Sequence, residues 1–355
     1  MTPTNREVIP LSRGALGIGE TGHLAIAPRT KAEIQDADVT ESREQSRRDR
    51  LARAYQSLVG LCCGDAFGER FFIPEARSLI DQRAVPAPPW IFTDDTMMAI
   101  SIVSTLEEHA CIDQEHLARS FASNYDPTRG YGPAMHELLG RIRREVGSWR
   151  DEARALFGGQ GSFGNGSAMR VAPLGAYFAD DLDKVVEQAE RSAVTTHCHR
   201  EAVAGAIAVG VAAALAWQFG ISAEMPSAAE FLHQIHQRTP QSEVRNGILS
   251  AIDLPKSTSV RAAASLLGNG SKVTAQDTVP FALWSAACHL KDYEEALWAT
   301  VSGLGDRDTT CAIVGGIVVM QAGVRSIPKH WQDCREPIPR HMLKNYEMLS
   351  FTDNA

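Results

Sequence analysis

The sequence predicts an all-α protein, and two observations carry that prediction. Apolar residues recur at three- and four-residue steps in one segment after another, which is the period of one face of an α-helix. Alternating runs of β-branched residues are nearly absent, and no Asn-Gly hairpin signal joins two such runs. We therefore expect one compact, bundle-like helical domain over residues 46–350, preceded by a flexible leader over residues 1–45.

The helical pattern can be followed along the chain. Ser42 and Gln45 have the spacing of a capping box, so the first long helix is expected to begin there and to run toward "GDAFG" at 64–68. Later segments repeat the apolar period. They cover residues 114–125, 132–146, 181–194, 200–219, 227–238, 278–290 and 293–301.

Several of these segments carry glycine where alanine would form a better helix. Glycine costs about 1 kcal/mol relative to alanine in a helix interior. Its repeated use predicts that helices approach one another closely at these positions. They are Gly60, Gly64, Gly205, Gly210, Gly315 and Gly316.

The composition limits the classes of function. The chain has 355 residues, 44% of them apolar, and a net charge of -8, which opposes general binding to a phosphate backbone. No window reaches the roughly 18 uninterrupted apolar residues of a membrane helix, and the N-terminus lacks the apolar core of a secretory signal. The seven scattered cysteines do not suggest a disulfide framework, and Cys62 and Cys63 are interpreted as small core residues. A cytoplasmic protein is expected.

Two acidic stretches stand directly before apolar runs of helical length. "TDDT" at 93–96 precedes one run, and "GDRDTT" at 305–310 precedes another. Asp and Thr are common helix caps, so a single such stretch is explained by capping. Two stretches with more carboxylates than a cap needs suggest a shared site, and oxygen ligands of this kind suit Mg²⁺, Mn²⁺ or Ca²⁺. Several carboxylates together can hold two such ions, which is a known catalytic arrangement.

Three further features contain residues that suit a binding site. Asp65 lies between two glycines in an apolar helix, where a carboxylate must be paired or must face solvent at the helix end. The glycine-rich loop over 158–166, leading into a helix at Ser167, is either a diphosphate cradle or a plain connection. His197 and His199 favour helix capping or a substrate contact over a zinc site, because no further ligands follow at suitable spacing.

Taken together, these motifs resemble the ADP-ribosylglycohydrolase family. The resemblance covers roughly residues 50–325, with five motifs in the same order, and it implies an orthogonal all-α bundle in a single domain. The matching stretches are "GDAFG" at 64–68, "TDDT" at 93–96, "GNGSAMR" at 164–170, "TTHCHREA" at 195–202 and "GDRDTT" at 305–310.

The resemblance also implies roles for individual residues. Two Mg²⁺ ions, for which Mn²⁺ can substitute, are expected on ligands from both acidic stretches. Catalytic roles fall to the aspartates of the two stretches and to Glu69. The metal ligands are Thr93, Asp94, Asp95, Asp306, Asp308 and Thr309, and the substrate-binding residues are Asp65, Ser162, Phe163, Gly164, Asn165, Gly166, Ser167, Met169, Arg170 and His197.

Three positions depart from the family pattern. Phe72 stands where members of the family usually carry a glutamate, so Glu69 or Glu75 is the candidate replacement as general acid or base. Leu304 replaces a glycine and is expected to strain its turn. Arg307 replaces a threonine and is expected either to reach a phosphate or to face solvent.

The expected reaction is hydrolysis at the anomeric carbon of the distal ribose of ADP-ribose. Within the family, the stretches at 126–132 and 159–170 look closest to members that cleave O-linked ADP-ribose, so the resemblance slightly favours serine, O-acetyl-ADP-ribose or poly-ADP-ribose over arginine-linked substrates. The acceptor is a modified protein, a small ADP-ribosyl ester or a modified nucleic acid. We expect no membrane partner, and we expect the protein to be a monomer. The alternatives are an inactive ADP-ribose-binding relative and a metal-dependent hydrolase of nucleotide diphosphate bonds.

Overall fold

The computed structural model describes residues 31–222 and 225–345, with side chains from residue 44 onward. Within these ranges the chain forms sixteen α-helices and three 3₁₀-helices, and the only strand-like pairings are the isolated bridges Trp90–Arg335 and Gly164–Thr274. The predicted all-α class is confirmed. In chain order the α-helices are α1 (Lys31–Glu69), α2 (Ala76–Asp81), α3 (Asp94–His109), α4 (Gln114–Ser123), α5 (Pro133–Arg143), α6 (Trp149–Gly159), α7 (Ala172–Tyr177), α8 (Leu182–Ala193), α9 (Arg200–Ser222), α10 (Ala228–Arg238), α11 (Glu243–Ile252), α12 (Val260–Leu267), α13 (Ala275–Cys288), α14 (Tyr293–Ser302), α15 (Arg307–Ala322) and α16 (Lys329–Cys334), and the 3₁₀-helices are η1 (Asn165–Ser167), η2 (Val324–Ser326) and η3 (Arg340–Met342).

The first helix begins earlier than the sequence suggested. The chain divides into two units at Glu44/Gln45, and α1 begins at Lys31 within the first of them. The capping-box start at Ser42 is therefore wrong, because good helix formers such as Lys, Ala, Glu and Gln continue on its N-terminal side. Residues 1–30 of the predicted leader and 346–350 of the predicted domain lie outside the described residues.

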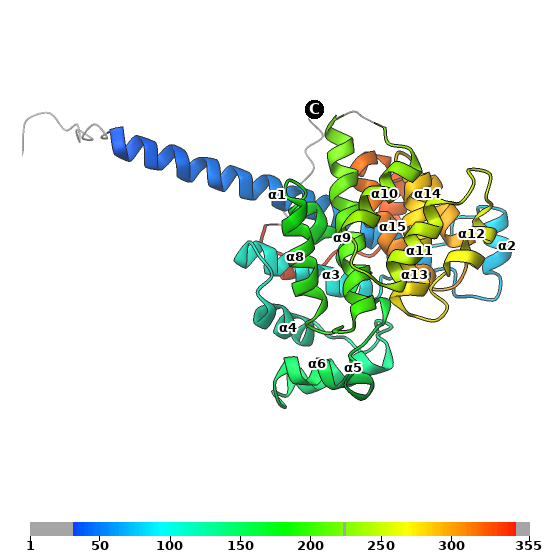
Figure 1. Cartoon of the computed structure of the whole chain (residues 1–355), viewed down its shortest axis with the longest axis horizontal. Coiled ribbons are helices and arrows are strands. Elements are labelled where there is room, and N and C mark those ends of the chain that lie inside the picture. The colour runs from blue at the N-terminus through cyan, green and yellow to red at the C-terminus, as the bar shows by residue number, and fades with distance from the viewer. Residues whose placement is uncertain (1–30, 223–224, 346–355) are drawn as a thin grey trace, which may run out of the picture. The chain divides into compact units, whose positions relative to one another are not determined.

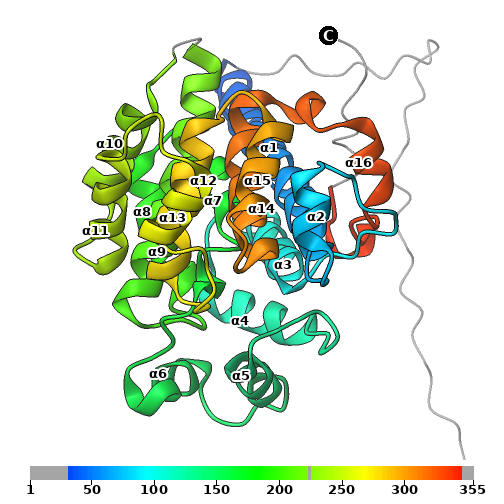
Figure 2. The ribbon, with the colours of Figure 1, turned by 90° about the vertical axis from the view of Figure 1, so that its right-hand side faces the viewer.

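Helix α9 forms the centre of the second unit. It packs against α7, α8, α13 and α15, and nearly every residue from Glu201 to Ala216 is buried (Figures 1 and 2). By length and hydropathy alone α9 resembles a membrane-crossing helix, but 78% of its apolar window is buried inside the fold. Such burial is what a core helix requires, since an apolar surface on all sides must be covered by neighbouring helices.

Helices α1 and α15 meet backbone to backbone, as the glycines predicted. A Cβ atom added to Gly60 would lie 2.4 Å from the carbonyl oxygen of Gly315, and one added to Gly64 would lie 2.1 Å from that of Cys311. Gly68, one turn further on, meets the carbonyl of Arg307 at 2.2 Å in the same way. No side chain fits between the helices here, so the "GDAFG" stretch of α1 lies directly against the N-terminal end of α15.

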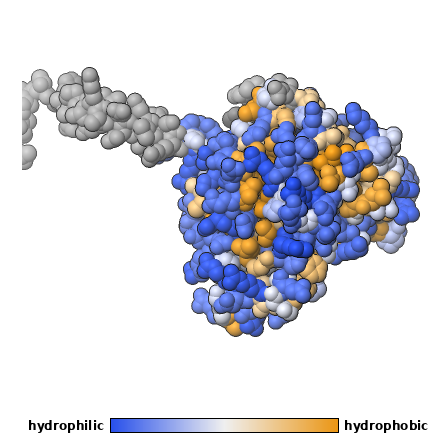
Figure 3. Space-filling model, in the orientation of Figure 1, coloured by the Kyte–Doolittle hydropathy of each residue, from blue (hydrophilic) through white to orange (hydrophobic). Residues whose placement is uncertain are grey.

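The outer parts of the unit are organised around this core. Helices α4, α5 and α6 lie together at one edge of the bundle (Figure 2). The space-filling view shows a largely hydrophilic face with separate apolar patches (Figure 3). All seven cysteines are free, and Cys62 and Cys63 are fully buried, in agreement with their interpretation as core residues.

Candidate active site

One cavity of about 600 Å³ collects most of the residues that the sequence singled out. Both acidic stretches, the glycine-rich loop and His197 contribute to its wall, together with the loop before α5. The lining residues from the predicted set are Asp94, Asp95, Ser162, Phe163, Gly164, Asn165, Gly166, Met169, His197, Asp306, Asp308 and Thr309.

At the start of α3, one residue caps the helix and the two residues that follow it line the cavity. Thr93 is the N-cap, and its hydroxyl accepts the backbone N–H of Asp95 at 3.3 Å. The carboxylates of Asp94 and Asp95 make no cap bond and lie on the cavity wall instead. Thr93 itself is not among the lining residues, so its predicted role as a ligand is less direct than that of the two aspartates.

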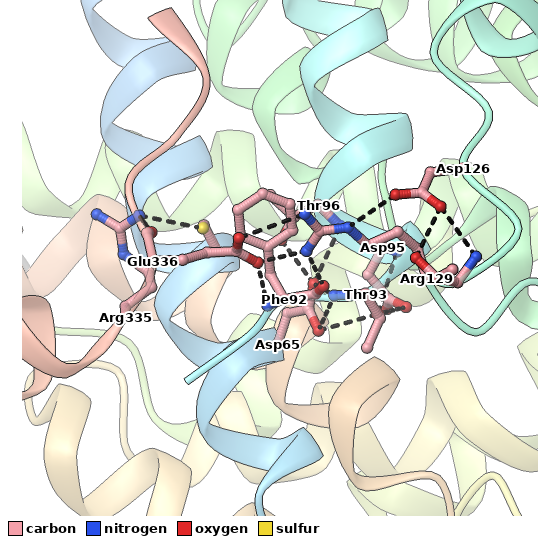
Figure 4. Close-up of polar contacts among 11 residues, drawn as sticks. Asp65, Phe92, Thr93, Asp95, Thr96, Asp126, Arg129, Arg335 and Glu336 are labelled. Carbon is pink, nitrogen blue, oxygen red and sulfur yellow. Dashed lines mark hydrogen bonds and ion pairs between the residues drawn. The ribbon is translucent and has the colours of Figure 1, made fainter. Parts of the chain in front are cut away.

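Asp65 of α1 anchors that helix start from below (Figure 4). Its carboxylate accepts the backbone N–H and hydroxyl of Thr93 at 3.0 and 2.9 Å, and those of Thr96 at 3.1 and 2.6 Å. The side chain is fully buried and does not line the cavity. The structure therefore places Asp65 behind the cavity wall, where its oxygens hold the start of α3.

The start of α15 presents its carboxylates differently. Asp306 occupies the N-cap position but makes no cap hydrogen bond. Its carboxylate accepts the side-chain N–H of Asn165 at 2.7 Å, and its backbone N–H donates to the carbonyl of Asn269 at 3.0 Å. Leu304 has a φ of +59°, which confirms that this position strains the turn in the way expected where glycine is preferred. The strained turn leads directly into Asp306.

Burial and mutual repulsion oppose ionisation of these carboxyl groups. Burial, followed by the charge of Asp65, raises the pKa of Asp94 to about 7. Burial, followed by Asp65 and Asp308, raises the pKa of Asp95 well above its ordinary value. Burial, followed by Asp306, does the same to the pKa of Asp308. Carboxyl groups arranged in this way ionise together only when positive charge is brought to them.

The donor atoms fit a hard cation such as Mg²⁺. Asp95 Oδ1 and Asp308 Oδ1 are buried and find no hydrogen-bond partner in the described part of the chain. Carboxylate and hydroxyl oxygens are the ligands that Mg²⁺ prefers. The aspartates line the cavity, but their carboxylate oxygens do not form a group of three within 4.8 Å of one another. Among residues 31–222 and 225–345, the one such group of potential ligands is Glu108, His109 and His116, which lies outside this cavity.

The glycine-rich loop is shaped by His197, which lies beneath it. A Cβ on Gly166 would lie 2.8 Å from the imidazole of His197, and one on Gly164 would lie 3.3 Å from it. Burial, followed by the charge of Arg170, lowers the pKa of His197 to about 3, so the ring is neutral. The helix expected at Ser167 is instead the short η1, and α7 begins at Ala172. His199 accepts the backbone N–H of Glu201 at 3.2 Å, which confirms its capping interpretation.

Two residues of the predicted substrate set are used inside the fold. Ser167 donates its hydroxyl to the carbonyl of Ala202 at 2.9 Å. Arg170 is fully buried, donates to the hydroxyl of Thr196 at 2.9 Å and lies over the ring of Phe121. Neither is among the residues that line the cavity, and both support the loop from inside the fold.

The positions at which this sequence departs from the family pattern also have structural explanations. Arg307 neither reaches the cavity nor faces solvent freely, because its guanidinium donates to the carbonyl of Phe71 and lies 4.6 Å from the ring centre of Phe72. Glu69 ends α1, half-buried, and burial followed by Asp65 raises its pKa. Glu69 does not line the cavity, and Glu75 is exposed at the N-cap of α2.

Several cavity residues had no recognisable signal in the sequence. Phe157 reaches the wall from a left-handed backbone position, φ +53°, inside α6. Lys272, Val273 and Thr274 come from the connection before α13. Tyr131 lies in a stretch that the sequence analysis noted without assigning the residue a role. These contributions depend on the tertiary fold, since no spacing in the sequence connects them.

A charged pair outside the cavity holds the approach to α3. Glu336 accepts the backbone N–H of Phe92 at 2.9 Å and forms an ion pair with Arg129 (Figure 4). The guanidinium of Arg129 lies 4.5 Å from the ring centre of Phe92, and the carbonyl of Arg129 accepts the N–H of Asp94 at 2.8 Å. The segments on both sides of Thr93 are thereby held in place.

Comparison with known proteins shows which proteins this chain resembles. The fold is shared with a solved ADP-ribosylglycohydrolase-related protein complex, at a TM-score of 0.58 and 22% identity, over 85% of this chain and 95% of that one. ADP-ribosylhydrolase ARH3 of Bos taurus is 29% identical over 340 residues, covering 81% of this chain and 89% of the relative. The human ARH3 is similar to the same degree, and an uncharacterized protein of Archaeoglobus fulgidus is 31% identical over 82% of this chain and 95% of its own length.

The chain is an all-α protein with one acidic cavity, and its family can be stated. The sequence profile described as ADP-ribosylglycohydrolase matches residues 46–350. The chain belongs to the ADP-ribosylglycohydrolase family and is an enzyme that removes ADP-ribose by hydrolysis.

Proposed function

We propose that this enzyme is Mg²⁺-dependent and cleaves the glycosidic bond at the anomeric carbon of the distal ribose, with O-linked acceptors favoured over arginine-linked ones. One observation carries the proposal. Asp95 of α3 and Asp308 of α15 lie far apart in the sequence, yet both line one cavity, and each has a buried oxygen without a partner among the described residues.

The proposed metal site uses both helix starts. Thr93, Asp94, Asp95, Asp306, Asp308 and Thr309 would hold two Mg²⁺ ions, or Mn²⁺ in their place, which would polarise the attacking water and bind the hydroxyls of the distal ribose. Asp65 fixes the start of α3 through Thr93 and Thr96, and Asn165 fixes the carboxylate of Asp306. Such fixed positioning of reacting groups can lower the activation barrier by several kcal/mol, roughly the size of effective-molarity effects.

The remainder of the cavity suits ADP-ribose. The loop from Ser162 to Gly166 lines one side and would follow the diphosphate, as the resemblance implies. Phe157 and Phe163, whose ring centres are 5.4 Å apart, form an apolar wall for the adenine base. The neutral ring of His197 supports the loop from behind without adding positive charge.

The preference for O-linked substrates rests on the stretches at 126–132 and 159–170. Gly130 and Tyr131 of the first stretch and the loop residues of the second line the same cavity. The proton from the attacking water would pass to an aspartate of the two clusters or to Glu69, which lies close enough to Asp306 for the two charges to interact. We also propose that the enzyme acts as a monomer and that it is cytoplasmic. The cytoplasmic location is supported by the odd number of scattered cysteines, which do not suggest a disulfide framework.

The test compares three substrates: ADP-ribosyl-serine peptide, O-acetyl-ADP-ribose and ADP-ribosyl-arginine, each with Mg²⁺ or EDTA. We expect metal-dependent release of free ADP-ribose, fastest from the O-linked pair. Asp94→Ala and Asp306→Ala should abolish that release, whereas Asp333→Ala, an exposed carboxylate on α16, should not. Release of AMP would instead identify a diphosphate hydrolase, and full turnover in EDTA would refute the metal assignment.

A further inference from the structure

A second hollow, of about 450 Å³, opens beside the acidic cavity and is lined by cations. Arg77 comes from α2, Arg261 from α12 and Lys272 from the connection before α13. The single carboxylate among its lining residues is Asp277. Asp277 is already engaged, since it accepts the backbone N–H of Lys272 at 3.0 Å and lies 3.5 Å from its ammonium group.

The second hollow and the acidic cavity lie next to each other and share part of their lining. Lys272 lines both of them. Asn269 and Leu304 line the second hollow, and the carbonyl of Asn269 accepts the N–H of Asp306, which lines the first. A substrate long enough to reach from the first hollow to the second would meet Lys272, which lines both, and the two arginines line the second.

Carboxylates compensate part of the positive charge of the second hollow, because Arg261 and Lys272 each lie within ion-pair distance of one. Arg77 is exposed and makes no ion pair within the part of the chain that the structure describes. Arg261 pairs with Asp81 at 3.3 Å, but both side chains are well exposed, and an exposed pair of this kind contributes little. A cationic hollow in a chain of net charge -8 focuses positive potential next to the site of hydrolysis.

We propose that Arg77, Arg261 and Lys272 form an acceptor subsite that binds a diphosphate on the far side of the cleaved bond, as carried by the next unit of an ADP-ribose chain. This inference rests on the proposed function. In such a chain the acceptor is the adenosine ribose of the next unit, whose 5′ carbon carries the diphosphate a few bonds away. Three cations from three elements around one compact hollow suit a single diphosphate. A nucleic-acid strand would need an extended basic surface.

The experiment compares two substrates in the charge-reversed variant Arg77→Glu/Arg261→Glu. One is an ADP-ribosyl-serine peptide, whose acceptor has no phosphate, and the other is an ADP-ribose dimer. We expect the ratio of kcat/KM for the dimer to that for the peptide to fall about tenfold through KM, since charged hydrogen bonds to the diphosphate are lost. The control Arg48→Glu/Arg119→Glu changes the net charge equally at exposed positions that line neither hollow, and should keep the ratio.

Calorimetry with the dimer in EDTA makes the test independent of catalysis. The Kd for the dimer should rise about tenfold in the double variant, while the Kd for monomeric ADP-ribose stays the same. An unchanged ratio and Kd, or an equal loss with both substrates, would overturn the subsite. An ADP-ribosylated oligonucleotide is measured as a third substrate, and a loss confined to it would assign the hollow to nucleic acid and overturn the proposal. If the wild-type enzyme cleaved neither substrate, the proposed function would fail, and the binding measurement would still decide the subsite.

Discussion

Individual residues in the two acidic stretches divide into those that cap a helix and those that do not. Thr93 caps α3 with its hydroxyl, whereas Asp95 and Asp306 make no cap hydrogen bond. The sequence could predict the aspartates because the same pattern occurs twice. It could not predict the role of Asp65, since four hydrogen bonds to Thr93 and Thr96 form only when α1 and α3 meet.

The buried oxygen of Asp95 gives a prediction about stability. In metal-free buffer, Asp95→Asn should raise the free energy of unfolding by about 1–2 kcal/mol, because a buried carboxylate next to other carboxylates is replaced by a neutral amide. The same variant should lose the increase in melting temperature that Mg²⁺ produces in the wild type. Thermal unfolding with and without Mg²⁺ measures both effects. An unaltered Mg²⁺ response in Asp95→Asn would contradict the assignment, and Asp333→Asn serves as the exposed control.

Phe157 lies on the cavity wall and has a strained backbone conformation. Its left-handed φ of +53° costs about 1 kcal/mol that glycine would not incur. We expect Phe157→Gly to leave stability unchanged or slightly higher, while KM for ADP-ribosyl substrates rises about tenfold from loss of the aromatic surface. Glu145 has a similar φ of +54° but does not line the cavity, so Glu145→Gly should affect stability alone. Equal KM values for the wild type and Phe157→Gly would show that the ring does not touch the substrate.

His197 gives a prediction about pH. Its folded-state pKa of about 3 lies below the unfolded value of about 6.5, so only the unfolded state takes up this proton as the pH falls below 6.5. Stability is therefore lost toward acid, and His197 accounts for about 2 kcal/mol of that loss between pH 7.5 and pH 5. His197→Asn should reduce the pH dependence of urea unfolding by this amount. If the free energy of unfolding depended on pH equally in the variant and the wild type, His197 would take up its proton in the folded state over the same pH range as in the unfolded state.

At the scale of helices, the glycines of α1 and α15 decide how the two acidic stretches come together. Gly64→Ala would place a methyl group 2.1 Å from the carbonyl oxygen of Cys311, so the helices must separate. We expect a loss of about 1–3 kcal/mol in urea unfolding, despite the better helix propensity of alanine, and a weaker affinity for Mg²⁺ measured by calorimetry. Gly140→Ala on α5 meets only the mobile end of Arg144 and should instead stabilise the protein by up to about 1 kcal/mol.

The helix boundaries show what local sequence could and could not predict. Apolar periodicity placed most helices, because each must cover part of one core. The start of α1 was missed because a plausible capping box lies within a longer run of helix formers. The start of α7 was also missed, since the contact of Gly166 with His197 leaves only the short turn η1 at Ser167. Both errors arise where contacts or propensities beyond the motif decide the backbone.

At the scale of the whole described unit, the fold depends on a segment that no motif marked. The recognised motifs end near residue 325, yet Trp331 packs among Phe67, Trp90 and Trp298. The backbone N–H groups of Lys344 and Asn345 donate to Glu107 at the other end of α3. The contacts with Glu107, and those of Trp331 with Phe67 and Trp90, join residues more than 200 positions apart, so no local pattern predicts them. The segment after α15 thus holds α3 at both ends.

The last prediction concerns that segment and the metal site together. Glu336→Gln removes the negative charge of a carboxylate that pairs with Arg129 and accepts the N–H of Phe92, the residue before the N-cap of α3. We expect the free energy of unfolding to fall by about 1.5–3 kcal/mol and the Kd for Mg²⁺ to rise about tenfold, because Asp94 and Asp95 lose a fixed position. Glu336→Asp should restore part of the affinity, and Asp333→Asn, nearby and exposed, should change neither quantity. Calorimetric titration with Mg²⁺ separates two roles for Glu336. A loss of stability with an unchanged Kd would make it a structural residue alone, whereas a parallel loss of both would show that the C-terminal segment sets the geometry of the active site.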